Sequence, residues 1–265
     1  MPDTSLSAVI AAAGSAARFG GMGQLKEKIG GKSVLSHALD IFEDDVDCIE
    51  VIVAVSPAVR EWIKGDPLTF ASGKLKLVDG GGTRAESVAA AVREATGEIV
   101  AIHDGNRPNC GAGLLDKLKA TVLPERGAVP AVPLTDGCAY ITAIGDGQPV
   151  NGDGPAGNEI FGGKRSDHRL GHLMEHAGGE GLHLLQSPQL YYRQSFLHAL
   201  EAVGADPLGY DGDAELYIAG GFEVAAIPGA WSNIRIVCQA DLRLLTKLMG
   251  GGKGKKKDRY GGLGW

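Results

Sequence analysis

The chain has 265 residues, a formal net charge of -6 and a hydrophobic fraction of 44%, enough apolar material for one large α/β domain with a substantial core. The acidic balance disfavours general nucleic-acid binding, because that function needs a basic face. The four cysteines form no C-x-x-C pair, and no segment has the features of a signal peptide or a membrane span, so we expect a cytoplasmic protein with reduced thiols and no zinc ribbon.

The predicted elements of the first half alternate between strands and helices. Short apolar runs predict strands at residues 8–12, 49–55, 75–78, 99–102 and 128–132. Helical periodicity, with Ser33 as the cap of the first helix, predicts helices at residues 33–43, 58–64, 85–95 and 113–122. This alternation predicts an α/β fold, a doubly wound, mostly parallel, Rossmann-like sheet with helices on both faces. Ligands of such sheets bind beyond the carboxyl ends of the strands.

The second half contains a polar excursion. Residues 138–144 are predicted as a strand, but residues 145–163 are rich in Gly, Asp, Asn and Pro, which predicts a projecting arm or a mobile insertion over about 137–181. The chain then returns to the core at 182–190. Further predicted elements are helices at 195–202, 213–219 and 240–249 and strands at 224–227 and 234–237. We expect one domain over residues 1–249 and a disordered Gly/Lys tail at 250–265.

A glycine-rich loop follows the first predicted strand. Its glycines, between residues 14 and 23, can take positive φ, so that backbone N–H groups turn inward and form a concavity for an anion. Arg18 and Lys26 add positive charge there. The spacing matches neither G-x-x-x-x-G-K-[ST] nor G-x-G-x-x-G, which disfavours a P-loop ATPase or a nicotinamide enzyme. The loop therefore predicts a triphosphate site, and a plain tight turn is the alternative.

Charged residues follow the strand predicted at 99–102. Asp104 is suited to Mg²⁺, because this cation takes one or two carboxylates together with phosphate oxygens; helix capping or a turn is the alternative. Arg107 either binds a phosphate in a bidentate manner or pairs with Asp104. Asp211, Asp213 and Arg235 lie near other predicted element ends and are candidates for the same site. Each of them alone is only slightly better evidence for a site than a charged residue of a solvated loop.

A second glycine run, Gly80 to Gly82, precedes the predicted helix that contains Ser87. Backbone without side chains lets a flat base lie against it, and Ser87 or backbone amides then read the edge of that base. Arg84 lies at the same helix entry, either facing the cleft or at the surface. The three strand-end loops together predict one ligand site at the carboxyl edge of the sheet.

A competing motif lies in the polar excursion. His168, His172 and His176 recur every four residues, and His172-Leu-Met-Glu175-His176 fits the inverted metalloprotease pattern H-x-x-E-H. On a helix, two of these histidines would share a face and hold zinc. Because Gly171 would lie inside that helix, a fortuitous motif on an exposed helix is favoured over a zinc hydrolase.

Several motifs in order resemble the 2-C-methyl-D-erythritol 4-phosphate cytidylyltransferases over about residues 7–249, apart from the glycine-rich excursion. The first are Ala12-Ala-Gly-Ser-Ala-Ala-Arg18, Lys26, Asp79-Gly-Gly-x-x-Arg84-x-x-Ser87-Val88 and Ile102-His-Asp104-x-x-Arg107-Pro108. The later ones are Pro133-Leu-Thr-Asp136, Ser187-Pro188-Gln189, Asp211-x-Asp213-Ala214, Gly221-Phe222 and Asn233-Ile234-Arg235.

The resemblance implies that a phosphate oxygen of the acceptor attacks the α-phosphorus of CTP and that pyrophosphate leaves. It implies catalytic roles for Arg18, Lys26 and Arg235 and a Mg²⁺ ion held by Asp104. The implied nucleotide-binding residues are Ala12, Ala13, Gly14, Ser15, Gly80, Gly81, Gly82, Arg84, Ser87 and Asp104. The implied acceptor-binding residues are Arg107, Thr135, Asp136 and Asp211. The arm would cross to a second copy in a homodimer, and no nucleic acid or membrane partner is implied.

The chain departs from the family pattern at several positions. Arg235 stands where the family usually has lysine, and an acid, Glu27, follows Lys26. The arm's usual threonine and arginine fall at Gly137 and at about Gly179. Loss of one charge-assisted contact to a buried phosphate costs about 1.5–3 kcal/mol. Residues that could replace the contact are Thr135, Lys164, Arg165 and Arg169. Two alternatives therefore stay open, namely another polyol or sugar phosphate as acceptor and a nucleotide-binding homologue without catalysis.

Overall fold

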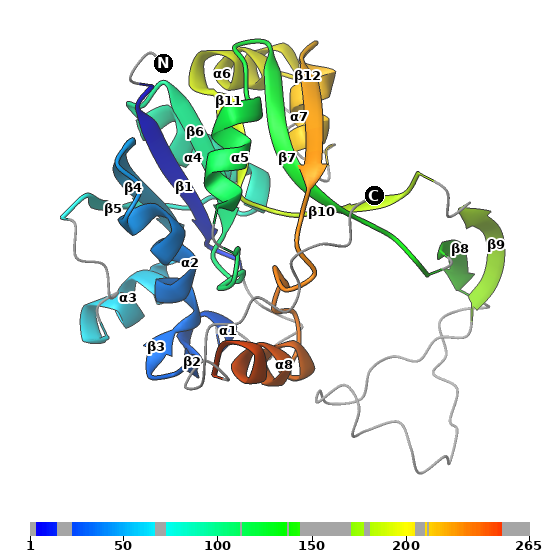
Figure 1. The fold of residues 1–265 in the computed structure, drawn as a ribbon, viewed down its shortest axis with the longest axis horizontal. Coiled ribbons are helices and arrows are strands. Elements are labelled where there is room, and N and C mark those ends of the chain that lie inside the picture. Colours follow the sequence, from blue (N-terminus) through cyan, green and yellow to red (C-terminus); the bar gives the residue numbers. More distant parts are fainter. Residues whose placement is uncertain are drawn as a thin grey trace.

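The computed structural model describes residues 4–14, 23–66, 73–111, 113–136, 138–143, 171–177, 181–204, 210 and 212–250, and within 138–143 and 171–177 the backbone alone. Its centre is an eight-stranded sheet with helices packed on both faces (Figure 1). The strands of the sheet are β1 (Leu6–Ala12), β4 (Cys48–Val55), β5 (Leu75–Asp79), β6 (Ile99–Asp104), β7 (Arg126–Pro133), β10 (His183–Leu185), β11 (Gln189–Tyr192) and β12 (Glu223–Pro228).

The strand order is β10-β7-β11-β6-β1-β4-β5, and β12 pairs with β7 outside this path. β1 is parallel to β4 and to β6, β4 is parallel to β5, and β12 is parallel to β7. β11 runs antiparallel to β6 and β7, and β10 runs antiparallel to β7. The predicted mostly parallel sheet is confirmed, and β1, β4, β5 and β6 end at the same edge.

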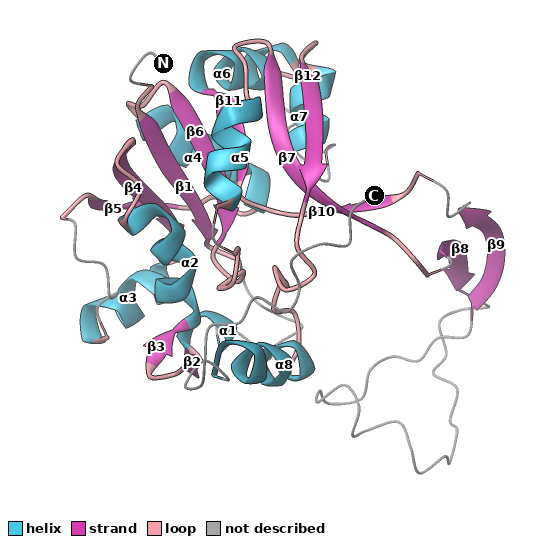
Figure 2. Ribbon diagram, in the orientation of Figure 1, coloured by secondary structure: helices cyan, strands magenta, loops and turns pink. Residues whose placement is uncertain are grey.

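Helices cover both faces of the sheet (Figure 2). Alternate residues of β1 point to opposite sides, so that Ile10 packs in one core cluster and Val9 in the other. The helices of the Ile10 cluster are α2 (Val34–Glu43), α3 (Pro57–Gly65) and α5 (Leu114–Thr121). Those of the Val9 cluster are α4 (Arg84–Glu94), α6 (Arg193–Ala202) and α7 (Asp213–Ala219). The doubly wound arrangement is therefore as predicted.

A smaller apolar cluster lies beside the carboxyl edge. The short helix α1 (Gly23–Lys26) leads into a hairpin of β2 (Lys28–Ile29) and β3 (Lys32–Ser33), and α8 (Gln239–Gly250) packs on this hairpin (Figure 1). Ile29, Val34, Ile236, Leu242 and Leu245 form the buried contact. The cluster joins the segment after Lys26 to the segment that carries Arg235.

The described part of the predicted arm is a separate two-stranded sheet, which projects away from the main sheet in Figure 1. β8 (Cys138–Ala143) pairs antiparallel with β9 (Gly171–Ala177). His172 and His176 lie on β9, where they pair with Thr142 and Ala139, so the helix expected for this motif is wrong. Backbone pairing with β8 outweighs the helical spacing of the histidines. Residues 144–170, with His168, and the tail at 251–265 lie outside the described residues.

Two other predicted segments differ from expectation. Residues 234–237 form no strand; the backbone of Ile236 instead pairs with the loop after β6, donating from N to the Asn106 carbonyl (2.9 Å). Residues 182–190 return to the core only in part, since Leu184 and Leu185 on the sheet-edge strand β10 are each 48% exposed while Leu190 is fully buried. Among the described residues, no helix is both long enough and apolar enough to traverse a bilayer.

A buried carboxylate joins three strands at the opposite edge of the sheet. Glu50 Oε1 accepts hydrogen bonds from Ser7 Oγ (2.7 Å), Thr96 N (2.6 Å) and Thr96 Oγ1 (2.7 Å), while Lys76 on β5 pairs with Oε2. Burial alone would raise the pKa of Glu50, but the hydrogen bonds from Lys76, Ser7 and Thr96 outweigh burial and lower the pKa to about 2.

We expect the substitution Glu50→Gln to lower the free energy of unfolding by about 2 kcal/mol at pH 7, because it removes a charge that several donors stabilise. The folded-state pKa of about 2 lies below the ordinary value of 4.5, so the stabilisation is complete above pH 4.5 and is lost as the pH falls toward 2. Urea unfolding at pH 7 and at pH 3 measures this: the gap between wild type and variant should shrink by more than half. An equal gap at both pH values would contradict the assignment.

Candidate functional site

A cavity opens at the carboxyl ends of β1 and β6. Small side chains line the cavity at the end of β1, and charged side chains line it at the end of β6. Residues of α1 and of the segment after β12 complete its walls. The lining residues are Ala11, Ala12, Ala13, Gly14, Gln24, Leu25, Arg84, Ser87, Asp104, Asn106 and Arg235. The site therefore lies where an open α/β sheet binds its ligands.

Asp104, the last residue of β6, is surrounded by arginines. Arg84 Nε donates to its Oδ1 (3.0 Å) and Arg107 Nε donates to its Oδ2 (3.0 Å). Arg235 Nε lies 3.8 Å from Oδ2, a looser ion pair. Burial would raise the pKa of Asp104, but the charges of Arg84, Arg235 and Arg107 outweigh burial and hold the pKa well below its usual range. Asp104 is therefore an anion at neutral pH.

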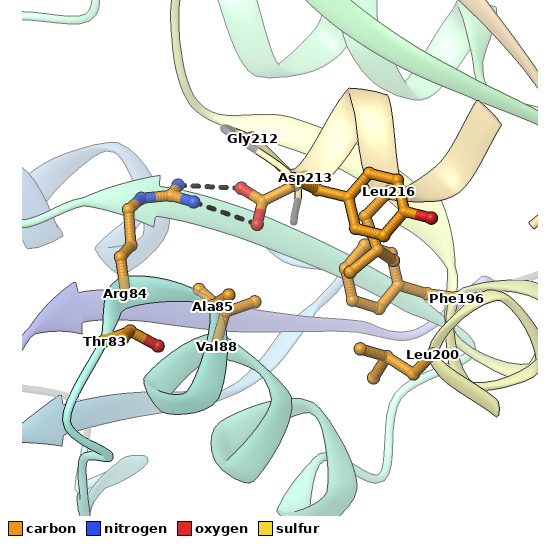
Figure 3. A pocket seen from close by; sticks show the side chains of 10 residues that line it. Thr83, Arg84, Ala85, Val88, Phe196, Leu200, Gly212, Asp213 and Leu216 are labelled. Carbon is orange, nitrogen blue, oxygen red and sulfur yellow. Dashed lines mark hydrogen bonds and ion pairs between the residues drawn. The ribbon is translucent and has the colours of Figure 1, made fainter. Parts of the chain in front are cut away.

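Arg84 connects this carboxylate to a second one. It donates from Nη1 to Asp213 Oδ1 (2.9 Å) and from Nη2 to Asp213 Oδ2 (2.7 Å), the bidentate pair drawn in Figure 3. Burial alone would lower the pKa of Arg84, but Asp213 and Asp104 raise it. Three arginines thus share two carboxylates, which leaves one excess positive charge beside the cavity. Such an excess favours a polyphosphate.

The Arg84–Asp213 pair also borders a second cavity of about 190 Å³ between α4, α6 and α7 (Figure 3). Its floor is apolar, formed by Val88, Phe196, Leu200 and Leu216. Asp104 and Arg235 line the first cavity and not this one. The Arg84–Asp213 pair therefore separates this cavity from the one that Asp104 and Arg235 line.

The backbone of Asp104 is fixed by a buried hydrogen-bond chain. Ser187 Oγ accepts from Asp104 N (3.0 Å) and bonds His103 Nδ1 (2.9 Å), and His103 Nε2 bonds the Arg107 carbonyl oxygen (3.1 Å). Burial lowers the pKa of His103 to about 4, so its imidazole is neutral at pH 7. The neutral ring donates from Nε2 to the carbonyl and accepts the Ser187 hydroxyl at Nδ1, which holds the loop after β6 in place.

The glycine run after β5 packs against the loop after β1. A Cβ atom at Gly80 would lie 2.3 Å from Ala13 Cβ and 2.9 Å from Ser87 Oγ, so only glycine allows this approach. Ser87 Oγ donates to the Thr83 carbonyl (2.7 Å) and accepts from Gly81 N (3.1 Å). Its single donor is therefore occupied, and it faces the cavity with acceptor capacity only.

Comparison with known proteins identifies the family. A sequence profile described as 2-C-methyl-D-erythritol 4-phosphate cytidylyltransferase matches residues 6–146. The enzyme of that name from Cereibacter sphaeroides is 30% identical over 247 residues, which cover 92% of this chain and 96% of the relative. The chain belongs to this family. A bifunctional enzyme IspD/IspF from Maricaulis maris is also 30% identical over 246 residues, which cover 89% of this chain and 55% of that relative.

Solved structures agree with this assignment. The 2-C-methyl-D-erythritol 4-phosphate cytidylyltransferase from Thermus thermophilus matches with a TM-score of 0.64 and 25% identity, covering 92% of this chain and 98% of that one. The 4-diphosphocytidyl-2C-methyl-D-erythritol synthase from Anaerococcus prevotii matches in fold with a TM-score of 0.69 and 21% identity, covering 94% and 99%. The resemblance and the fold predicted from the sequence are confirmed, and the protein is a nucleotidyltransferase.

The structure of the cytidylyltransferase brings many of the predicted site residues together. Those that line one cavity are Ala12, Ala13, Gly14, Arg84, Ser87, Asp104 and Arg235. Gly80 and Gly81 contact Ser87 directly behind it, and Gly82 lies at the same turn. Ser15, Arg18 and Asp211 lie outside the described residues.

Other predicted residues are placed differently. Lys26 does not line the cavity; its ammonium group lies 5.9 Å from the centre of the Trp62 ring on α3. Arg107 is buried, and it donates to Asp104 and to the Asn233 carbonyl (Nη1, 2.9 Å). It acts within the protein, so the expectation that it binds the acceptor gains no support. Thr135 and Asp136 are exposed just after β7.

Several residues that hold the site together were given no role from the sequence. Asn106 and Gln186 are buried and bond the backbone around Arg235, while Ser187 orients Asp104. Asp213 was weighed, but nothing in its surroundings in the sequence distinguishes it from an acidic residue of a helix first turn. A buried Gln or Asn beside a strand end is a weak sequence signal, because its partners are distant in the chain.

Proposed function

We propose that this cytidylyltransferase joins CTP to 2-C-methyl-D-erythritol 4-phosphate, giving CDP-methylerythritol and pyrophosphate for isoprenoid precursor synthesis by the non-mevalonate pathway. A phosphate oxygen of the acceptor forms a bond to the α-phosphorus of CTP, and the bond from that phosphorus to the β-phosphate breaks. Family membership over nearly the whole chain supports this reaction. The observation that carries it is the group of Asp104, Arg84, Arg107 and Arg235, called the Asp104 cluster below. This cluster has an excess positive charge and lies at the cavity that small residues line after β1.

Arg235 is the cation that we assign to the transition state. Its side chain is 49% exposed, it lines the cavity, and its ion pair with Asp104 is long. It is therefore available for the negative charge that grows on the phosphoryl oxygens, whereas Arg84 and Arg107 are committed to carboxylates. Ala12 to Gly14 offer backbone to the triphosphate. Lys26 joins Arg18 and Ser15 on the triphosphate in this proposal and must leave the Trp62 ring to do so.

Mg²⁺ fits this site when it binds together with the nucleotide. Both carboxylate oxygens of Asp104 already accept an arginine Nε, which leaves lone pairs for one carboxylate ligand. Mg²⁺ requires near-octahedral oxygen ligands and retains waters, so phosphate oxygens must supply the rest. When bound, the ion neutralises charge on the phosphates. Asp104 holds it in this proposal.

We therefore expect Mg²⁺ to bind this protein only together with CTP. Calorimetric titration of Mg²⁺ into the protein alone should give no saturable heat up to about 1 mM, whereas titration with CTP present should saturate. Asp79→Asn serves as the control, because Asp79 ends β5 outside the cavity. Tight binding of Mg²⁺ to the protein without nucleotide would contradict this assignment.

We place the acceptor between the cavity and the arm, near Thr135 and Asp136. Asp211, the third residue expected to bind it, lies outside the described residues. The β8–β9 hairpin projects from the main sheet (Figure 1), and Leu184 and Leu185 on β10 are exposed. Both features support a homodimer formed through the arm, which we expect in the cytoplasm. Light scattering should give twice the mass of one chain, and Leu184→Glu should shift the protein toward monomer. A monomeric wild type would exclude this assembly.

Pyrophosphate release tests the reaction directly. The purified protein is incubated with CTP, Mg²⁺ and each of several phosphorylated polyols and sugars, and ATP, GTP and UTP serve as nucleotide controls. Turnover with methylerythritol phosphate and CTP supports the proposal. Turnover with a different acceptor favours the alternative raised by the departures at Gly137 and Gly179. CTP binding without turnover on any acceptor would instead indicate a non-catalytic homologue.

A further inference from the structure

The segment that carries Arg235 has no sheet to hold it. Residues 233–237 form no strand, and hydrogen bonds to a loop and a helix fix the side that follows Arg235. Ile236 N donates to Asn106 O (2.9 Å), and Asn106 Nδ2 donates to Ile236 O (2.8 Å). Asp241 Oδ2 on α8 accepts from Val237 N (2.8 Å) and Cys238 N (2.9 Å). The side that precedes Arg235 is a turn over residues 229–233. Gly229 N donates to the Ala131 carbonyl (2.8 Å), Asn109 Nδ2 to the Ser232 carbonyl (3.2 Å) and Asn233 Nδ2 to the Ser187 carbonyl (2.9 Å), and a further support joins both ends of this turn. A catalytic cation on a loose segment would lose the alignment on which transition-state stabilisation depends.

Gln186 supplies that support. This buried residue lies between β10 and β11, and its Nε2 donates to the carbonyl oxygens of Ala230 (2.8 Å) and Asn233 (3.3 Å). Its Oε1 accepts from Ala230 N (3.1 Å) and from Asn233 Nδ2 (3.5 Å). Its own backbone N donates to the Pro130 carbonyl in β7 (2.8 Å). One side chain thus fastens both ends of the turn to the central sheet.

The surroundings of Gln186 are shaped for this contact. A Cβ atom at Gly229 would lie 2.4 Å from Gln186 Oε1, so glycine is what allows the amide to reach the turn. The Asn233 carbonyl that accepts from Gln186 also accepts from Arg107 Nη1 (2.9 Å), and Arg107 holds Asp104. The Gln186 amide and Arg107 of the Asp104 cluster therefore bond the same atom, the carbonyl oxygen of Asn233, two residues before Arg235.

We propose that Gln186 is a positioning residue of the transferase, whose side-chain amide clamps the 229–233 turn and so aligns Arg235 with the Asp104 cluster. The proposal rests on the transition-state role assigned to Arg235. Gln186 lies outside the cavity lining and touches no substrate. Its loss should affect kcat more than KM, because Arg235 acts in the transition state and the nucleotide-binding backbone of β1 is untouched.

The substitution Gln186→Met keeps the length of the side chain and removes its amide. We expect kcat to fall about 10- to 100-fold and the KM for CTP to change by less than about threefold. Gln186→Glu turns a carboxylate oxygen toward the carbonyls of Ala230 and Asn233, so its loss should be at least as large. Gln186→Leu, which also removes the amide, replaces Gln186→Met if that variant does not fold. Ser7→Ala, a buried polar loss elsewhere, and Gln194→Met, the same change on α6, should leave kcat unaltered.

A double-mutant comparison separates positioning from general destabilisation. In an Arg235→Gln background, Gln186→Met should lower kcat by less than about threefold, because the residue it aligns is gone. The same fold-change in both backgrounds would overturn the proposal. Trp231, an exposed residue of the turn, gives a readout that does not need activity, since its fluorescence anisotropy should fall in Gln186→Met relative to wild type.

The two possible failures are distinguishable. An unchanged kcat in Arg235→Gln alone would refute the role proposed for Arg235. An unchanged anisotropy of Trp231 in Gln186→Met, taken as the difference from the matching Trp231→Phe proteins, would refute the clamp itself.

Discussion

Replacement of Asp104 by Asn is expected to lower kcat/KM about 1,000-fold and to destabilise the fold by about 3–5 kcal/mol, because it breaks a buried ion network from one side. The carboxylate accepts from Arg84 and Arg107 at 3.0 Å each, and Arg235 is a third cation nearby. An asparagine amide would turn an NH₂ group toward one of these guanidinium groups. The arginines would then repel one another, and the cavity would lose both its shape and the carboxylate that we propose as the Mg²⁺ ligand.

Asp79 offers a matched control for this substitution. It is also the last residue of a parallel strand and it also pairs with an arginine, since Arg60 donates to its Oδ1 from Nε (3.1 Å) and Nη2 (2.8 Å). Its side chain is 85% exposed, however, so Asp79→Asn should change stability by less than about 1 kcal/mol and leave turnover unaltered. Steady-state kinetics and thermal unfolding of both variants measure the contrast. Equal activities of the two variants would show that Asp104 has no role in the reaction.

The central strands could be predicted from the sequence because both of their faces are buried. β1, β4 and β6 are apolar along most of their length, and the prediction erred by only one or two residues at their ends. The stretch at 234–237 is also mostly apolar, with Arg235 as its one charged residue, yet Ile236 bonds the Asn106 loop instead of a neighbouring strand. Local sequence cannot decide between these outcomes, since both satisfy the backbone with hydrogen bonds.

The candidate site was predictable where the chain marks it with glycines or a strand end. Asp104 and the small residues after β1 line one cavity, as expected. The pairing of Arg84 with Asp213 was not predictable, because the two residues are 129 positions apart and each alone resembles a helix-terminal charge. Arg107 was assigned to the acceptor from its position in the motif, but burial and two internal acceptors direct it inward.

Arg235 provides the second large effect. We expect Arg235→Ala to lower kcat by about 100- to 1,000-fold at saturating CTP, because it removes a preorganised donor for the phosphoryl oxygens. Stability should change by less than about 1 kcal/mol, because the guanidinium is half exposed and its ion pair with Asp104 spans 3.8 Å. Arg235→Lys, which restores the residue usual in the family, should recover much of the activity as a point charge but lose the planar guanidinium.

The comparison that decides the role of Arg235 is with Arg60→Ala. Arg60 is also a partly exposed arginine paired with a strand-end aspartate, but it lies on α3 away from the cavity. Both changes remove one positive charge, so a long-range effect of net charge on CTP binding would appear equally in the two variants. A loss of kcat confined to Arg235→Ala, with KM for CTP altered by less than about threefold, places this cation on the transition state. Retention of kcat within about threefold in Arg235→Ala would transfer that role to the loop with Arg18 and Lys26.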